Sequence, residues 1–233
     1  MPRVLALETS TAQASLVICS DEKILAHESS SSPKTHSEFF NLAIERCLAQ
    51  AQLQLSDIDL YAVGSGPGSF TGLRVSASIV KTFSLSFLKP LVVVDSLTLL
   101  MEEARARGAS DEKIVCLLNA HKNMNYLALF SKSSVEIYPC ARTIAQINLL
   151  DFQSSQPVLC VGEGFLAYES QFSNQFISQI RRDPIHSDIP LAETLAVCGQ
   201  RNAKLGQTIV WNSYEPLYIR ASEAEENLKS KSY

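Results

Sequence analysis

A glycine-rich segment, GSGPGSFTGLR from Gly64 to Arg74, is the part of this sequence best suited to chemistry. It follows a strand predicted over Leu60–Val63 and leads into a helix predicted from about Gly72 to Leu88, with Ser69 or Thr71 at its start. Such a turn presents backbone N–H groups beside the positive end of a helix dipole, which is a general way to hold an anion. A tight strand-to-helix turn with an ordinary N-cap explains the same residues. The candidate anion- or nucleotide-binding residues of this loop are Gly66, Gly68, Ser69, Thr71, Gly72 and Arg74.

Three common catalytic patterns do not fit this loop. A Walker A loop would continue into Gly-Lys-Ser or Gly-Lys-Thr, and no such run follows these glycines. Ser69 stands where a dinucleotide-binding fingerprint has its third glycine. Pro67 and Thr71 flank Ser69 at the two positions where a nucleophile elbow has glycines. We therefore predict no catalytic residues here.

A second polar segment, Glu8-Thr9-Ser10-Thr11, joins two predicted strands near the N-terminus. One acid and three hydroxyls can bind Mg²⁺ and phosphate in a two-lobed nucleotide-binding fold. They can equally close a hairpin through hydroxyl-to-backbone hydrogen bonds. We add Glu8, Thr9 and Ser10 to the candidate nucleotide-binding residues, and note a weaker turn motif at Val161–Gly164.

The histidines and cysteines argue against a metal centre. The four histidines, His27, His36, His121 and His186, include no pair four residues apart, so no helix face presents two imidazoles to one ion. The six cysteines are widely scattered without a C-x-x-C pair, which fits neither a zinc knuckle nor a compact disulfide scaffold. We predict no metal, no tightly bound cofactor, and free thiols in a reducing compartment.

Length and composition predict a folded protein of one large domain or two small ones. The chain has 233 residues, of which 46% are hydrophobic, enough to bury a real core. The formal net charge of −4 provides no overall basic field to attract phosphate backbones, so we expect a partner to hold any nucleic acid. The apolar stretch at Val4–Leu7 is too short for a signal peptide, and no apolar run is long enough to span a bilayer. These features predict a cytoplasmic protein with no membrane partner.

The order of predicted elements indicates an α/β fold with two lobes. A first lobe over residues 1–100 reads βββαβα, with hairpin-connected strands and then helical crossovers. We predict a second, smaller α/β lobe over residues 101–233, whose C-terminal helix and tail pack back on the first lobe. The predicted strands are 3–7, 15–19, 23–27, 60–63, 91–94, 114–118, 126–130 and 157–161; the helices are Thr35 or Ser37 to about 52, 72–88, 97–107 and 190–204.

Several of these segments together resemble the TsaB (YeaZ) family, the bacterial subunit of the machinery that makes threonylcarbamoyladenosine in transfer RNA. The resemblance is specific over about residues 3–100 and weaker beyond them. The segments that carry it are Leu7–Thr11, Thr35–Glu38, Leu55–Asp59, Gly66–Arg74 and Pro90–Leu97, with echoes at Val161–Gly164 and Pro216–Arg220.

The resemblance implies an actin-like, Hsp70-like (ASKHA) fold of two related lobes, with mixed sheets flanked by helices. It implies a non-catalytic scaffold subunit that dimerises with the catalytic paralogue TsaD, assisted by the small ATPase TsaE. That complex transfers a threonylcarbamoyl group to the adenosine next to the anticodon of tRNA, so tRNA would meet this chain only through the complex. ATP or ADP at the complex interface and a homodimer of the free chain are further implications.

The second lobe departs from the family pattern at one place. Asn119-Ala120-His121-Lys122 stands where the family tends to carry an Asp-Ala-Arg-Arg-type motif, and Met124 stands where a glutamate is expected. These changes matter for the function of the second lobe if the motif touches a ligand or partner in the family.

The helix after the glycine loop has apolar or small residues nearly all round, which is typical of a helix covered on two sides. Its broad stripe of Leu73, Ala77, Val80, Phe83 and Phe87 is predicted to face the sheet. Val75, Ile79 and Thr82 lie off that stripe and are the predicted partner interface, covered by a helix of the catalytic paralogue or of a second copy. Cover by the other lobe is the alternative.

Two other functions are weighed against the scaffold role. A nucleotide-dependent ATPase or kinase of the same superfold would need a catalytic aspartate in the second lobe and an adenosine-binding Gly-Gly motif, and neither is visible. A glycoprotease-type peptidase would need a metal-binding histidine pair or an activated nucleophile, which the sequence also lacks.

Overall fold

The structure is a computed structural model that describes residues 2–11, 13–21, 23–30, 36–109, 112–132, 134–182 and 191–220. Thr35, one of the two predicted helix starts, His186 and the tail from residue 221 lie outside these ranges. Across the described part of the chain, no helix combines the length and the apolar character needed to cross a membrane.

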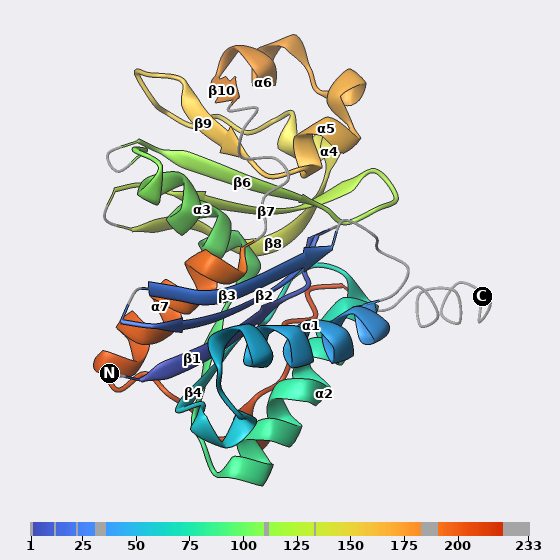
Figure 1. The fold of residues 1–233 in the computed structure, drawn as a ribbon. Helices are drawn as coiled ribbons and strands as arrows, with labels where there is room; N and C mark the ends of the chain where they lie inside the picture. The colour runs from blue at the N-terminus through green and yellow to red at the C-terminus, as the bar shows by residue number, and fades with distance from the viewer. Residues whose placement is uncertain are drawn as a thin grey trace, which may run out of the picture.

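The first sheet has five strands in the order β3-β2-β1-β4-β5 (Figure 1). β2 runs antiparallel to β1 and β3, whereas β4 runs parallel to β1 and β5. Two helices, α1 (His36–Ala51) and α2 (Phe70–Phe87), cover one face of this sheet. The strands are β1 (Arg3–Glu8), β2 (Ala14–Ser20), β3 (Lys23–Ser30), β4 (Leu60–Gly64) and β5 (Leu91–Val94).

The second sheet repeats this topology. Its order is β8-β7-β6-β9-β10, with the same alternation of antiparallel and parallel pairs. Its outer face carries α4 (Ile144–Ile147), α5 (Gly164–Ala167) and α6 (Asn174–Ser178). The strands are β6 (Ile114–Asn119), β7 (Met124–Phe130), β8 (Val135–Thr143), β9 (Val158–Val161) and β10 (Ile180–Arg182); short 3-10 turns are η2 (Leu55–Asp57), η3 (Glu169–Gln171) and η5 (Trp211–Ser213).

Helix α2 shows why the local sequence folds as it does. Ser69 is its N-cap and accepts a hydrogen bond from the Gly72 N–H, so the helix begins at Phe70, two residues before the predicted start. Of the predicted core stripe, Leu73, Ala77 and Val80 are buried, whereas Phe83 and Phe87 toward the end of the helix are half-buried.

Two helices exchange between the lobes. α3 (Ser96–Ala106) follows β5 of the first sheet but packs on β6, β7 and β9 of the second. α7 (Ala192–Lys204) comes after β10 of the second sheet but packs on β1, β2, β4 and β5 of the first. In Figure 1 the green α3 and orange α7 lie between the two sheets. Each sheet therefore has its inner face covered by a helix that follows the other sheet along the chain.

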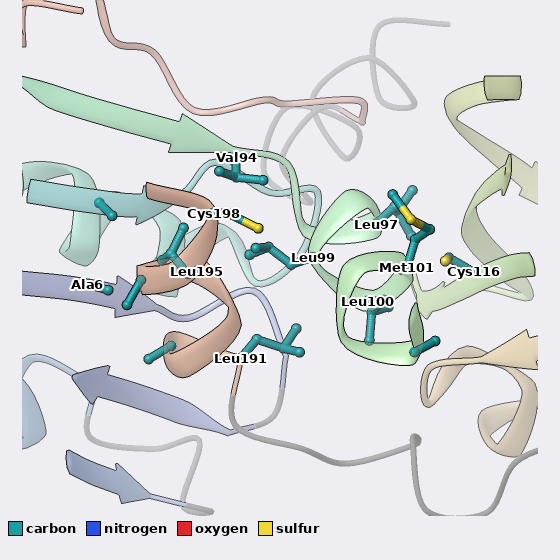
Figure 2. Packing of buried hydrophobic residues seen from close by; sticks show 14 of the residues in the cluster. Ala6, Val94, Leu97, Leu99, Leu100, Met101, Cys116, Leu191, Leu195 and Cys198 are labelled. Atoms are coloured by element: carbon teal, nitrogen blue, oxygen red, sulfur yellow. The ribbon is translucent and has the colours of Figure 1, made fainter. Parts of the chain in front are cut away.

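This exchange builds one continuous apolar core between the sheets. Figure 2 shows Leu195 of α7 near Ala6 of β1 and Cys198 near Val94 and Leu99, while Met101 of α3 points toward Cys116 of the second sheet. Polar contacts join the two helices at the edge of this core: Arg201 of α7 forms a two-pronged ion pair with Glu102 of α3, at 2.9 and 3.1 Å. The inner face of each sheet is thus buried by the same cluster.

Sequence patterns predict the first lobe well and the second less completely. Strands β8 and β10 and the short helices α4, α5 and α6 are not predicted. β8 contains Pro139 and mixes polar with apolar residues at the sheet edge, and β10 has only three residues, two of them arginines. Neither strand has the apolar run or the strict alternation on which strand prediction depends.

Because Leu195 of α7 is fully buried between the lobes, replacing it should cost more than replacing an exposed residue of the same helix. We expect Leu195→Ala to lower the free energy of unfolding by about 2–5 kcal/mol, from lost burial and the cavity left behind. Val197→Ala, at a position 51% exposed, is the matched control and should change it by about 0.5 kcal/mol or less. Urea denaturation measures both; equal effects would contradict this account of the inter-lobe core.

Candidate functional site

The two polar segments singled out in the sequence meet at one edge of the first sheet. β1 and β4 are parallel neighbours, so the turn after Glu8 and the glycine loop after Gly64 leave the sheet side by side. The Ser69 N–H donates to the Ser10 carbonyl at 3.2 Å, and the Thr9 and Ser76 hydroxyls lie 3.1 Å apart. The carboxyl ends of parallel strands are where open α/β sheets bind ligands. The predicted nucleotide-binding residues therefore share one site.

Glycines make this close approach possible. A Cβ atom on Gly68 would lie 2.3 Å from the Ser10 carbonyl oxygen, and one on Gly72 would lie 2.6 Å from the Thr9 carbonyl oxygen. Both distances are too short for any other residue unless the backbone shifts. The loop is thus fitted against the Glu8–Thr11 turn and leaves no space between the two at these points.

Glu8 is the ionisable group at the centre of the site. It has no exposed surface, and the Ser10 N–H lies 3.1 Å from both of its carboxylate oxygens. Burial raises the pKa of Glu8 above its ordinary value of 4.5, and the hydrogen bonds from Ser10 oppose part of that rise. The carboxyl group lies beside Gly64, where a Cβ atom would come within 2.3 Å of its oxygen.

Several backbone N–H groups of the glycine loop donate hydrogen bonds to other groups of this chain. The Gly72 N–H donates to the Ser69 hydroxyl, and the Ser69 N–H is held by Ser10. Thr71 and Arg74 are exposed, and the Arg74 guanidinium stacks 4.0 Å from the centre of the Phe70 ring. The anion- or nucleotide-binding role of these residues stays a prediction, with Arg74 and Thr71 as its outward-facing members.

The structure also brings to this site a segment that the site prediction leaves out. Tyr214 is buried, the Leu217 N–H donates to the Ser65 carbonyl at 2.8 Å, and the Tyr218 ring lies 5.0 Å from the Phe70 ring. The sequence marks this segment only through the resemblance of Pro216–Arg220 to the family. That resemblance does not indicate where the segment packs.

The second lobe carries an equivalent turn with its acid in a different place. Gly162-Glu163-Gly164 follows β9 as the glycine loop follows β4, and Glu163 Oε1 accepts from the Asn119 N–H at 3.1 Å. The Asn119 side chain in turn accepts from the His121 N–H and the Tyr168 hydroxyl, at 2.8 and 3.0 Å. Asn119 and His121, which depart from the family pattern, thus stabilise this turn. Met124, the third departure, is the first residue of β7.

The three predicted interface residues lie on α2 in two different environments. Val75 and Ile79 are half-buried against the apolar core of their own lobe, whereas Thr82 is exposed. Thr82 donates its hydroxyl proton to the Ser78 carbonyl one turn earlier, at 2.8 Å. The alternative of cover by the other lobe finds no support here, because Val75 and Ile79 pack on the core of the first lobe and α2 covers the face of the first sheet that points away from the second lobe.

Metal-binding side chains do not gather in the described ranges: no three of His, Cys, Asp and Glu there come close enough to hold an ion. All six cysteines are free thiols, and five of them are buried.

Comparison with known proteins places these features in a family context. The model of a protein family described as TsaD, tRNA N6-adenosine threonylcarbamoyltransferase, matches residues 23–228. The chain is 26% identical to the tRNA threonylcarbamoyladenosine biosynthesis protein TsaB of Escherichia coli, over 98% of this chain and 99% of that protein. It is 29% identical to TsaB of Haemophilus influenzae, over 93% of each.

Solved structures confirm the predicted fold class. YeaZ from Pseudomonas aeruginosa superposes with a TM-score of 0.79 at 19% identity, covering 94% of this chain and all of that one. Component A of the (R)-2-hydroxyglutaryl-CoA dehydratase of Acidaminococcus fermentans superposes with a TM-score of 0.50 at 9% identity, covering 88% of this chain and 100% of that one. With two sheets of identical topology, the chain has the two-lobed, actin-like architecture.

The buried carboxyl group makes a pH prediction. Because the pKa of Glu8 is higher in the folded chain than in the unfolded chain, the folded state holds the proton longer, and Glu8 lowers stability as the pH rises above about 4.5. Glu8→Gln removes this titration but keeps an oxygen for the Ser10 N–H. We expect the stability of Glu8→Gln relative to the wild type to increase with pH from about 4.5 upward, as measured by urea denaturation at a series of pH values.

A difference between Glu8→Gln and wild type that stays constant over this pH range would show that Glu8 does not titrate differently on folding.

Proposed function

Because the chain belongs to the family described as TsaD, tRNA N6-adenosine threonylcarbamoyltransferase, and to its TsaB (YeaZ) branch, we propose that it serves threonylcarbamoyladenosine formation in tRNA as a non-catalytic subunit. The observation that carries the proposal is the match to TsaB proteins over 98% of the chain in one relative and 93% in another. Its reaction would be performed by a catalytic paralogue of the TsaD type.

The geometry of the first-lobe site supports an accessory role. A general acid or base must reach the proton that it transfers, and Glu8 has no exposed surface. The glycine loop is packed against the Glu8–Thr11 turn without room for a ligand at Gly68 and Gly72. These features favour a site that stabilises the fold over one that turns over substrate.

The partners in this proposal are a TsaD-like catalytic paralogue and a TsaE-like ATPase, with ATP or ADP bound where the subunits meet. The surface proposed for the paralogue, or for a second copy in the free chain, is the outer side of α2 with Val75, Ile79 and Thr82. The net charge of −4 supports a tRNA that is held by the complex, since phosphate contacts dominate nucleic-acid affinity.

Reconstitution tests the function directly. The purified chain is combined with the catalytic paralogue and the ATPase of the same organism on unmodified tRNA, and the modified nucleoside is measured by mass spectrometry. We expect product with all components and none when this chain is omitted. Product from this chain alone would contradict the non-catalytic role, and full product without it would contradict the role in this pathway.

The interface is tested by adding a charge to α2. Ile79→Glu and Thr82→Glu should each weaken binding to the paralogue at least tenfold, because burying an isoleucine is worth about 1.5–3 kcal/mol and a buried unpaired carboxylate costs more. Thr82 is exposed in the free chain, so its variant separates loss of binding from loss of folding. Calorimetry measures affinity and circular dichroism measures folding.

Ile177→Glu is the matched control, since Ile177 is 40% exposed on α6 of the second lobe. It should leave affinity unchanged. Unchanged affinity in folded Ile79→Glu and Thr82→Glu would remove α2 from the interface, without bearing on the reconstitution result.

A further inference from the structure

After α7 the chain returns along the first lobe to the edge of its sheet. Ile209 pairs with Leu91 of β5 through two backbone hydrogen bonds of 2.8 and 2.9 Å. Turn η5 then packs beside α2. The residues that follow, Tyr214–Arg220, form a segment with no regular secondary structure that runs over the site described above. We call this segment the C-terminal strap.

Tyr214 anchors the strap in the core of the first lobe. Its side chain is 1% exposed and belongs to the same apolar cluster as Leu5, Leu7 and Tyr61. Burial raises the pKa of the Tyr214 hydroxyl, and the nearby Tyr218 and Glu8 raise it further, so the ring lies within electrostatic reach of the buried carboxyl group. The ammonium group of Lys81 lies 5.6 Å from the ring centre.

The middle of the strap lies over the carboxyl end of β4. The Leu217 N–H donates to the Ser65 carbonyl at 2.8 Å. A Cβ atom on Gly66 would lie 3.2 Å from the Leu217 carbonyl oxygen, and Gly66 has a φ of +95°, so both its conformation and its small size admit the strap. The strap therefore lies directly against the start of the glycine loop.

A tilted aromatic pair joins the strap to the glycine loop. The Tyr218 ring lies 5.0 Å from the Phe70 ring, and the Arg74 guanidinium lies 4.0 Å from the centre of the Phe70 ring. Such aromatic pairs contribute beyond their burial. The strap therefore contacts the first turn of α2, where two of the candidate anion-binding residues are exposed.

The end of the strap reaches the second lobe. The Arg220 guanidinium donates to the carbonyl of Ala120, and to that of His121 at 3.4 Å. These carbonyls belong to the β6–β7 turn, which occupies the same place in the second sheet as the Glu8–Thr11 turn occupies in the first. One short segment thus touches the corresponding regions of both lobes.

From these contacts we propose that the C-terminal strap is an internal latch. It occupies the edge where a ligand would bridge the two lobes, and it holds the glycine loop and the β6–β7 turn in their closed arrangement without any ligand. The inference does not depend on the proposed function, because it concerns contacts within this chain.

Hydrogen–deuterium exchange of the full chain, read by mass spectrometry, tests the latch. Arg220→Ala and Tyr218→Ala should each speed amide exchange at least tenfold in residues 64–74 and 119–124, because these loops would open locally without the strap. Arg182→Ala is the matched control: Arg182 stacks 4.5 Å from the Phe165 ring and pairs with Glu169, entirely within the second lobe. It should leave both loops unchanged, and Tyr218→Phe, which keeps the ring, should behave as the wild type.

Three results would overturn the latch. The first is faster exchange confined to residues 214–220, which would make the strap a passive tail. The second is no change in any strap variant, including a chain that ends at Glu215. The third is strong protection of both loops when Mg-ATP is added to the wild type, which would show that a ligand, and not the strap, closes the lobes.

Discussion

The exchange of α3 and α7 between the lobes is the interaction on which the rest of the structure depends. The central strands β1, β4, β6 and β9 are buried along nearly their whole length, so each sheet needs cover on both faces. The outer faces are covered by helices of the same lobe, but each inner face receives its helix from the chain that follows the other sheet. Neither sheet can bury its inner face alone, and the apolar cluster around Leu195 and Met101 therefore couples the lobes in one folding unit.

The strand order within the first sheet fixes the edge at which the candidate site forms. With β1 and β4 parallel and adjacent, the Glu8–Thr11 turn and the glycine loop must leave the sheet together, and only glycine at positions 68 and 72 lets them touch. In the second lobe the carboxylate comes from the glycine turn instead of the first strand: Glu163 lies in the turn after β9 and accepts a hydrogen bond from the N–H at the end of β6. In both lobes a carboxylate accepts a backbone N–H near the end of the first strand, which offsets part of the cost of its burial.

The sequence predicts a strand, a helix or a buried residue correctly where one local pattern of residues determines it. Apolar runs predict β1, β4 and β9, the cap at Ser69 predicts the helix after the loop, and its periodicity predicts that Leu73 and Val80 are buried. The polar edge strand β8 and the strap lack such signals. The Glu8–Thr11 turn and the glycine loop are each ambiguous alone, and the contact between them follows from strand adjacency, which neither segment encodes locally. The matching topology of the two sheets is not encoded by local patterns either, and only the family resemblance implies two related lobes.

The packing of the site also bears on how such a fold serves a complex. Leu217 and Tyr218 lie across the loop that follows β4, and Glu8 is buried beneath it. If the strap is the latch proposed above, it limits the motion of the lobes, and a rigid surface loses less conformational entropy on association than a mobile one. The outer side of α2 is carried by the same sheet that the inter-lobe core fixes, so a partner docking there meets a surface that is already ordered. Closing the site from within and presenting a preformed helix are thus two consequences of one packing arrangement.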